Sequence, residues 1–179
     1  VEGAVQALNQ GRYREAAQFF EQAWRDSTRC DVPFYLGLAR QRLRDDTGAI
    51  IAFRAAAECA PGLTEARLAL AEAYASRGDY NGALASYEEI LRRIPGHAAA
   101  SRAAAKLYLR HELNDKAVAV LETLAAREPG DVEVRAGLGA AYAATSVPEK
   151  AEEQFRAALK LNPSFPSALV GLGNLLVKR

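Results

Sequence analysis

Four prolines recur at one fixed interval, and this interval constrains the fold more than any other feature of the chain. Each lies 34 residues after the one before it: Pro61, Pro95, Pro129 and Pro163. Proline removes a backbone donor and cannot continue a helix, so each one marks a helix end at the same place in a repeated unit. A period of this length is typical of a chain that stacks one small helical unit on the next.

Other residue types repeat in phase with the prolines. An alanine recurs at Ala49, Ala83, Ala117 and Ala151, and four residues later come Phe53, Tyr87, Leu121 and Phe155. Small residues recur at Gly37, Ala71, Ala105, Gly139 and Gly173. We interpret all of these as packing residues, because small side chains let two helices approach closely and the aromatic rings fill the remaining space.

This pattern resembles the tetratricopeptide repeat over the whole chain. The resemblance implies an all-α fold, namely a right-handed superhelical solenoid of antiparallel helix pairs, as a single domain over residues 1–179. The expected parts are a partial repeat at 1–29, full repeats at 30–63, 64–97, 98–131 and 132–165, and a truncated terminal helix at 166–179. Within the third full repeat we expect helices over 98–111 and 115–127. Because the chain contains no methionine, we expect it to be part of a longer protein.

The turns carry residues that favour helix caps. Asp31 and Asp131 each precede an apolar residue at an expected helix start, and Ser146 stands three residues before Glu149 as in a capping box. We therefore predict N-caps at these three positions.

Composition excludes some classes of function. The chain has 23 basic and 22 acidic residues and a net charge of +1, so it lacks the basic excess of a nucleic-acid-binding protein. No apolar run is long enough to predict a membrane span. The alanine-rich and arginine-rich composition suggests a bacterial source.

The resemblance implies that the first helix of each repeat lines a concave groove that binds a protein or peptide. The predicted partner-binding residues are Phe34, Leu38, Arg42, Glu65, Glu72, Arg102, Lys106, Arg110, Ala136, Ala140 and Asn174. Arg102, Lys106 and Arg110 are spaced four residues apart and share one helix face. This basic stripe either anchors an acidic segment of the partner or is a solvated surface balanced by Glu65 and Glu72.

Two apolar features also have more than one interpretation. Ala136 and Ala140 either form a smooth floor for a partner or reflect helix propensity alone. In the terminal helix, Leu172, Leu175 and Leu176 predict an exposed apolar strip. A neighbouring chain, and hence self-association, or another part of the protein would cover this strip.

Catalytic and metal-binding chemistry is not predicted. His97 and His111 are the only histidines, they fall in expected turns, and no cysteine cluster lies beside them. A metal site needs three or four converging ligands. We therefore expect no enzyme activity, no cofactor and no metal.

Cys30 and Cys59 occupy the two ends of one repeat, which meet in an antiparallel helix hairpin. A disulfide is geometrically feasible there and would favour an oxidising compartment such as a periplasm. The alternative is a pair of free thiols in a bacterial cytoplasm, and the sequence leaves the localisation open between the two.

The leading hypothesis is a non-catalytic scaffold that binds a peptide or protein segment in its groove. One alternative is a structural or assembly module of a bacterial cell-envelope complex. The other is a regulatory domain of a larger enzyme.

Overall fold

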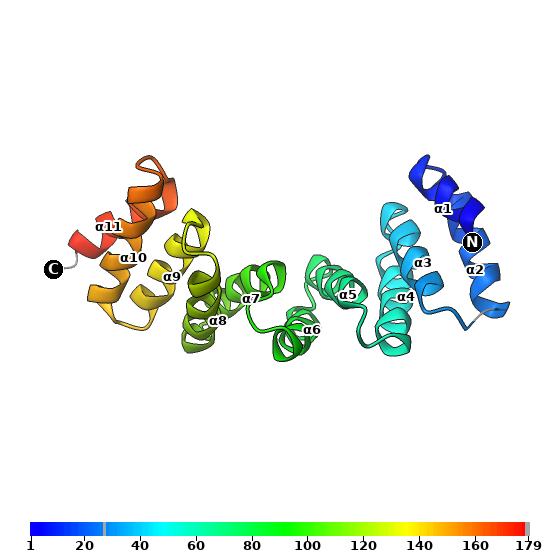
Figure 1. Cartoon of the computed structure of the whole chain (residues 1–179), viewed down its shortest axis with the longest axis horizontal. Coiled ribbons are helices and arrows are strands. Elements are labelled where there is room, and N and C mark those ends of the chain that lie inside the picture. Colours follow the sequence, from blue (N-terminus) through cyan, green and yellow to red (C-terminus); the bar gives the residue numbers. More distant parts are fainter. Residues whose placement is uncertain (27, 178–179) are drawn as a thin grey trace. The chain divides into compact units, whose positions relative to one another are not determined.

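The computed structural model describes residues 1–26 and 28–177, and within that part of the chain every regular element is an α-helix (Figure 1). This confirms the all-α prediction. The helices belong to two compact units, Val1–Ile90 and Leu91–Arg179.

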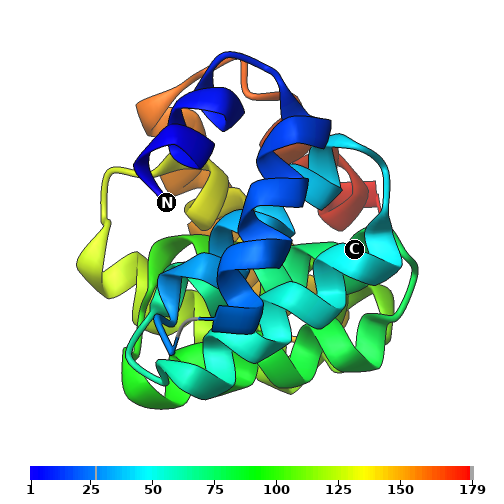
Figure 2. The same ribbon diagram turned by 90° about the vertical axis from the view of Figure 1, so that its right-hand side faces the viewer.

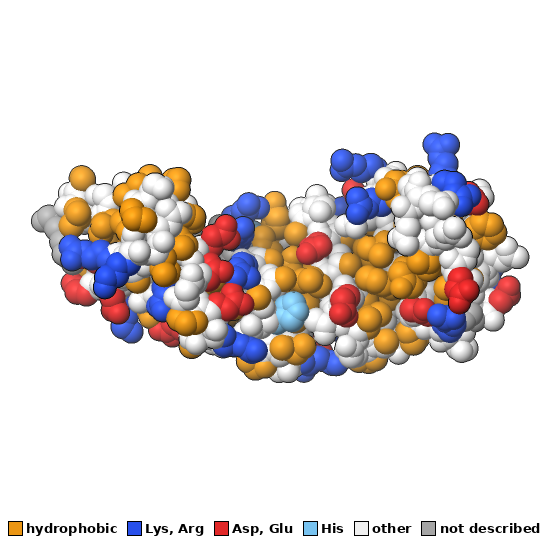
Figure 3. All heavy atoms as spheres, turned by 45° about the horizontal axis from the view of Figure 1, so that its top comes forward, with side chains coloured by type: hydrophobic (Ala, Val, Ile, Leu, Met, Phe, Trp, Pro, Cys, Tyr) orange, Lys and Arg blue, Asp and Glu red, His pale blue; other side chains and the backbone are white. Residues whose placement is uncertain are grey.

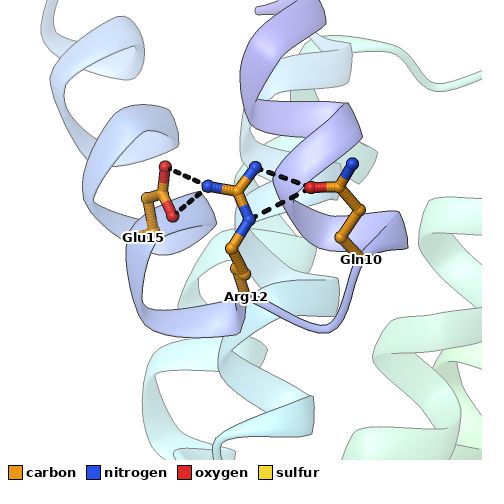
Figure 4. Close-up of polar contacts among 3 residues, drawn as sticks. All are labelled: Gln10, Arg12 and Glu15. Carbon is orange, nitrogen blue, oxygen red and sulfur yellow. Dashed lines mark hydrogen bonds and ion pairs between the residues drawn. The ribbon is translucent and has the colours of Figure 1, made fainter.

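The described residues of the N-terminal unit form five whole helices and most of a sixth, joined by short turns. They are α1 (Glu2–Asn9), α2 (Tyr13–Asp26), α3 (Asp31–Arg42), α4 (Asp46–Cys59), α5 (Thr64–Ser76) and most of α6 (Tyr80–Arg93). Figure 2 turns this unit toward the viewer, with α1 and α2 in dark blue and blue. The guanidinium of Arg12 supports the turn between these two helices by donating hydrogen bonds to Gln10 and Glu15 (Figure 4).

Beyond the end of α6, the described residues of the C-terminal unit form five helices. They are α7 (Ala98–Arg110), α8 (Asn114–Arg127), α9 (Val132–Ala144), α10 (Pro148–Leu161) and α11 (Pro166–Val177). The pairs α3–α4, α5–α6, α7–α8 and α9–α10 each fall within one predicted repeat. The predicted terminal segment 166–179 contains α11, and its last two residues lie outside the described residues.

Glycines at the repeated small position let paired helices touch. A Cβ atom on Gly37 of α3 would lie 2.5 Å from the ring of Phe53 in α4. A Cβ atom on Gly139 of α9 would lie 2.7 Å from the ring of Phe155 in α10. Real Cβ atoms do not approach other atoms so closely, so the packing interpretation of these glycines is confirmed.

The turn inside each helix pair uses one left-handed residue at a repeating position. It is glycine at Gly11 and Gly78, with φ angles of 77° and 78°. The equivalent residues Arg44, Glu112 and Ser146 have φ angles of 63°, 58° and 59° although each carries a side chain. Left-handed backbone costs a side-chain-bearing residue roughly 1–2 kcal/mol, so these three turns are strained.

The predicted caps have different outcomes. Asp131 is confirmed, because its side chain accepts a hydrogen bond from the Val134 amide at 3.0 Å. Asp31 is wrong as an N-cap, since α3 begins at Asp31 itself and its carboxylate accepts from Arg29. Ser146 is also wrong, because it takes the left-handed turn position and Val147 precedes α10.

Candidate partner-binding surfaces

A hollow of about 690 Å³ lies in the C-terminal unit, on the side formed by α7, α9 and α11. α7 and α9 are the first helices of their pairs and α11 is the terminal helix, and on these helices the sequence predicts partner-binding residues. Its lining is Lys106, Glu133, Ala136, Gly137, Ala140, Phe155, Phe165, Pro166, Ser167, Val170 and Gly171. The hollow therefore brings together three predicted residues, Lys106, Ala136 and Ala140.

Small residues produce this hollow. Ala136 and Ala140 are one turn apart on α9, so neither fills the space beside α11. The buried ring of Phe155 lies between Gly139 of α9 and Gly171 of α11, and a Cβ atom on either glycine would overlap it. The result is an apolar floor with helix backbone close to the surface.

Two opposite charges flank the apolar floor. Lys106 of α7 and Glu133 in the first turn of α9 are both exposed and line the hollow. Within the described part of the chain neither side chain forms an ion pair. Both charges therefore face solvent or a partner.

Arg102, in contrast to Lys106 and Glu133, is held in ion pairs. Its guanidinium lies 2.5 Å from the Glu128 carboxylate and also pairs with Asp131, so it links α7 to the α8–α9 turn. The hydrogen bond to Asp131, followed by the charges of both acids, raises the pKa of Arg102. Burial of the Asp131 carboxyl opposes its ionisation, but bonds from the Val134 amide and Arg102 outweigh burial and lower its pKa. Arg102 therefore has a structural role at this turn.

The three residues of the predicted basic stripe thus have different surroundings. Lys106 lines the hollow, Arg102 is held in ion pairs, and Arg110 is exposed in the last turn of α7. The acids that balance Arg102 are Glu128 and Asp131 of its own unit, in place of the expected Glu65 and Glu72. Anchoring of an acidic segment stays a prediction for Lys106 and Arg110.

In the N-terminal unit, Phe34 and Leu38 of α3 are half-buried and serve partly as core. Both pack against a buried cluster that includes Phe53 of α4 and Leu70 and Ala73 of α5. The Phe34 and Phe53 rings are tilted, with centroids 6.0 Å apart. Each side chain therefore presents only its outer edge to a partner.

The neighbouring helix α5 adds acidic groups to this surface. Glu65 and Glu72 are exposed and two turns apart, with the half-buried Leu68 between them. Partial burial of the Glu72 carboxyl raises its pKa. Burial, assisted by the charge of Glu72, raises the pKa of Tyr87 to about 12. In Figure 3 apolar side chains gather over the N-terminal unit with a few acidic side chains among them.

The two other predicted residues lie near helix ends. Arg42 is the exposed last residue of α3, and Asn174 is exposed on α11. Asn174 does not line the hollow between α9 and α11. Sequence reasoning missed Phe165, Pro166 and Gly171, whose only signal is the proline that begins α11.

Cys30 and Cys59 are bonded in the structure. Cys30 precedes α3 and Cys59 is the last residue of α4, and their Cα atoms are 5.3 Å apart. The bond closes the open end of the α3–α4 hairpin, one turn before Phe34.

The terminal helix α11 has an apolar exposed surface. Ala168 is its one buried residue among those described, while Val170 is 62% and Leu176 51% exposed. Leu172 and Leu175 are half-buried, so the predicted strip is exposed at Leu176 but only in part at the other two leucines.

His97 has a role that the sequence did not reveal. It is the N-cap of α7, where its Nδ1 atom accepts a hydrogen bond from the Ala100 amide at 3.3 Å. His111 is the exposed residue after α7. Among the described residues no group of three potential metal ligands converges, and none of the described helices has the length and hydrophobicity to cross a membrane.

Comparison with known proteins identifies the repeat and the fold. A family model described as "Tetratricopeptide repeat" matches residues 75–141. No curated protein sequence matches the chain.

Solved structures of tetratricopeptide repeat proteins resemble the chain over most of its length. MamA from Desulfovibrio magneticus has a TM-score of 0.74 at 24% identity, over 83% of this chain and 84% of that one. YrrB, described as having an unusual peptide-binding site, has a TM-score of 0.80 at 17% identity, over 95% and 88% of the two chains. A repeat protein from Parabacteroides merdae has a TM-score of 0.81 at 18% identity, over 99% and 71%. At these identities the similarity establishes the fold alone.

Proposed function

We propose that this chain, which matches the tetratricopeptide repeat model over residues 75–141 and shares the fold of such repeat proteins, is a protein-interaction module. Its C-terminal unit binds a peptide or protein segment in the hollow between α9 and α11. The observation that carries the proposal is the hollow itself, at about 690 Å³. That volume lies within the range of about 300–1,000 Å³ that is usual for ligand-binding clefts. We propose that binding is non-catalytic.

The lining supports an apolar anchor with a polar margin. Ala140 and Val170 offer exposed apolar surface, and the buried Ala136 and Phe155 close the floor. Lys106 and Glu133 stand at its edge with no ion pair among the described residues. Interfaces commonly combine a buried apolar centre with a charged rim in this way. YrrB, which shares the fold, is described as a peptide-binding repeat protein.

A photo-crosslinking experiment tests the proposal. A benzoyl-phenylalanine side chain at position 140 lies in the hollow, while the same group at the exposed Ala126 position on α8 is the matched control. In lysate of the source organism, we expect a discrete crosslinked partner at position 140 that is absent at position 126. Crosslinks at position 126 alone, or identical products at both positions, would contradict a role for the hollow.

A second candidate function is an assembly module in an oxidising cell-envelope compartment. The bonded pair Cys30–Cys59 favours it, because disulfides persist mainly in oxidising compartments. Thiol titration of the denatured protein, isolated from its native source without reductant, tests this candidate. Two reactive thiols per chain would argue against it.

A further inference from the structure

We infer that the face formed by α3 and α5 in the N-terminal unit binds an amphipathic segment whose polar side chains are basic. This inference rests on the proposed function, in that the chain acts as a protein-interaction module, but it concerns a different surface and a defined partner chemistry. We call this surface the α3/α5 face and define it by Phe34, Leu38, Glu65, Leu68 and Glu72.

The spacing of these residues puts them on one surface. Glu65, Leu68 and Glu72 follow one another at three and four residues along α5, so they form one row. Phe34 and Leu38 are four residues apart on α3 and pack against the cluster that includes Leu70 and Ala73 of α5. The two helices therefore present a joint surface of half-buried apolar side chains and carboxylates.

The apolar part of this face suits the apolar side of a partner. Phe34, Leu38 and Leu68 are all half-buried, so each retains an exposed edge that a partner would cover. Contiguous apolar surface of this kind is more typical of interaction sites than scattered apolar residues are.

The carboxylates decide the charge of the partner. Within the described part of the chain, Glu65 and Glu72 form no ion pair. The nearby Asp31 differs, because Arg29 donates two hydrogen bonds to it. Arg42, which is basic, lies at the far end of α3. The α3/α5 face thus carries two negative charges without partners.

Glu72 differs from Glu65 in that its carboxyl is partly buried. Although the residue is exposed overall, partial burial of its carboxyl raises its pKa, and its charge acts on the buried Tyr87. Charges that are partly shielded from water interact more strongly with an approaching ion. A lysine or arginine against Glu72 would stabilise a complex, whereas a carboxylate there would be repelled.

The test uses three fluorescent 14-residue probe peptides with the same leucines at helical spacing. Their polar positions are all lysine, all glutamine or all glutamate. Fluorescence anisotropy with the full chain gives the Kd for each peptide. We expect the lysine peptide to bind at least about tenfold tighter than the glutamine peptide, and the glutamate peptide to bind weakest.

Variants locate the site. Glu72→Gln keeps the shape of the side chain and removes its charge. We expect this substitution to raise the Kd of the lysine peptide about three- to tenfold. Glu58→Gln, at an exposed residue on α4, is the matched control and should leave the Kd unchanged. Leu38→Ala should weaken the binding of all three peptides, because it removes apolar contact surface.

The outcomes separate the two proposals. Binding of all three peptides with equal Kd, or equal effects of Glu72→Gln and Glu58→Gln, overturns the basic-partner inference and leaves the interaction module standing. Binding of none overturns the inference, and the crosslink at position 140 then decides the proposed function independently.

Discussion

The substitution Gly171→Ala tests how closely α11 docks on the rest of the C-terminal unit. A Cβ atom at position 171 would lie 2.5 Å from the Cε1 atom of Phe155 and closer still to Cζ. The ring cannot retreat readily, because Phe155 is only 2% exposed and Gly139 contacts it from α9. We therefore expect the alanine to push α11 away from α10.

The magnitude follows from two opposing terms. Overpacking of a buried ring costs roughly 1–3 kcal/mol. Replacing glycine by alanine inside a helix stabilises it by up to about 1 kcal/mol. Gly173 lies on the same helix with nothing within 4 Å of an added Cβ atom, so Gly173→Ala isolates the second term. The two variants should therefore differ by roughly 1–3 kcal/mol, with Gly171→Ala the less stable.

Urea unfolding followed by far-ultraviolet circular dichroism measures the free energies of unfolding. Tryptophan fluorescence is unsuitable because the single tryptophan, Trp24, lies in the N-terminal unit. Hydrogen exchange of the α11 amides adds a local measurement, and Gly171→Ala should accelerate it. If Gly171→Ala is as stabilising as Gly173→Ala, α11 does not pack on Phe155 and the hollow lacks one of its walls.

Three further predictions concern stability. Arg102→Ala should lower the free energy of unfolding by about 1 kcal/mol in chemical denaturation. Because the folded-state pKa of Asp131 lies below its ordinary value of 3.8, this difference should be complete above about pH 4 and disappear as the pH falls further. Glu112→Gly should stabilise the chain by up to about 1 kcal/mol and Gly78→Ala should destabilise it, as judged by Tm, since both positions are left-handed. Reduction of the disulfide should cost about 3–4 kcal/mol in urea unfolding, because it releases a loop with a sequence separation of 29.

The helix pairs could be predicted from the sequence because the repeat fixes where each helix ends. In the third full repeat the predicted helices over 98–111 and 115–127 lie within a residue of Ala98–Arg110 and Asn114–Arg127. The packing residues could be predicted equally well, because a buried position recurs in every repeat whatever residues surround it. A periodic signal of this kind averages out local exceptions.

Local exceptions are where sequence reasoning failed. Ser146 has the spacing of a capping box, yet the turn requires a left-handed residue there, as at Gly78, and this backbone requirement prevails over the cap. Asp31 does not act as an N-cap, and its carboxylate instead accepts a hydrogen bond from Arg29, two residues earlier. Both outcomes depend on competition between neighbours, which spacing alone does not describe.

The surface was less predictable than the core. Lys106 and Arg102 are equivalent by helix spacing, but only the structure distinguishes a lysine at the hollow from an arginine held by Glu128 and Asp131. That distinction depends on where the α8–α9 turn brings its two carboxylates, which is a tertiary property.

The two units differ in the charge that they offer to a partner. In the C-terminal unit the basic side chain at the hollow, Lys106, is offset by Glu133, so apolar contact would supply most of the affinity there. In the N-terminal unit α5 carries Glu65 and Glu72, which form no ion pair among the described residues. Repeats that share their packing residues can thus differ in the partner chemistry of each helix face, because the packing positions and the surface positions of a repeat point in different directions.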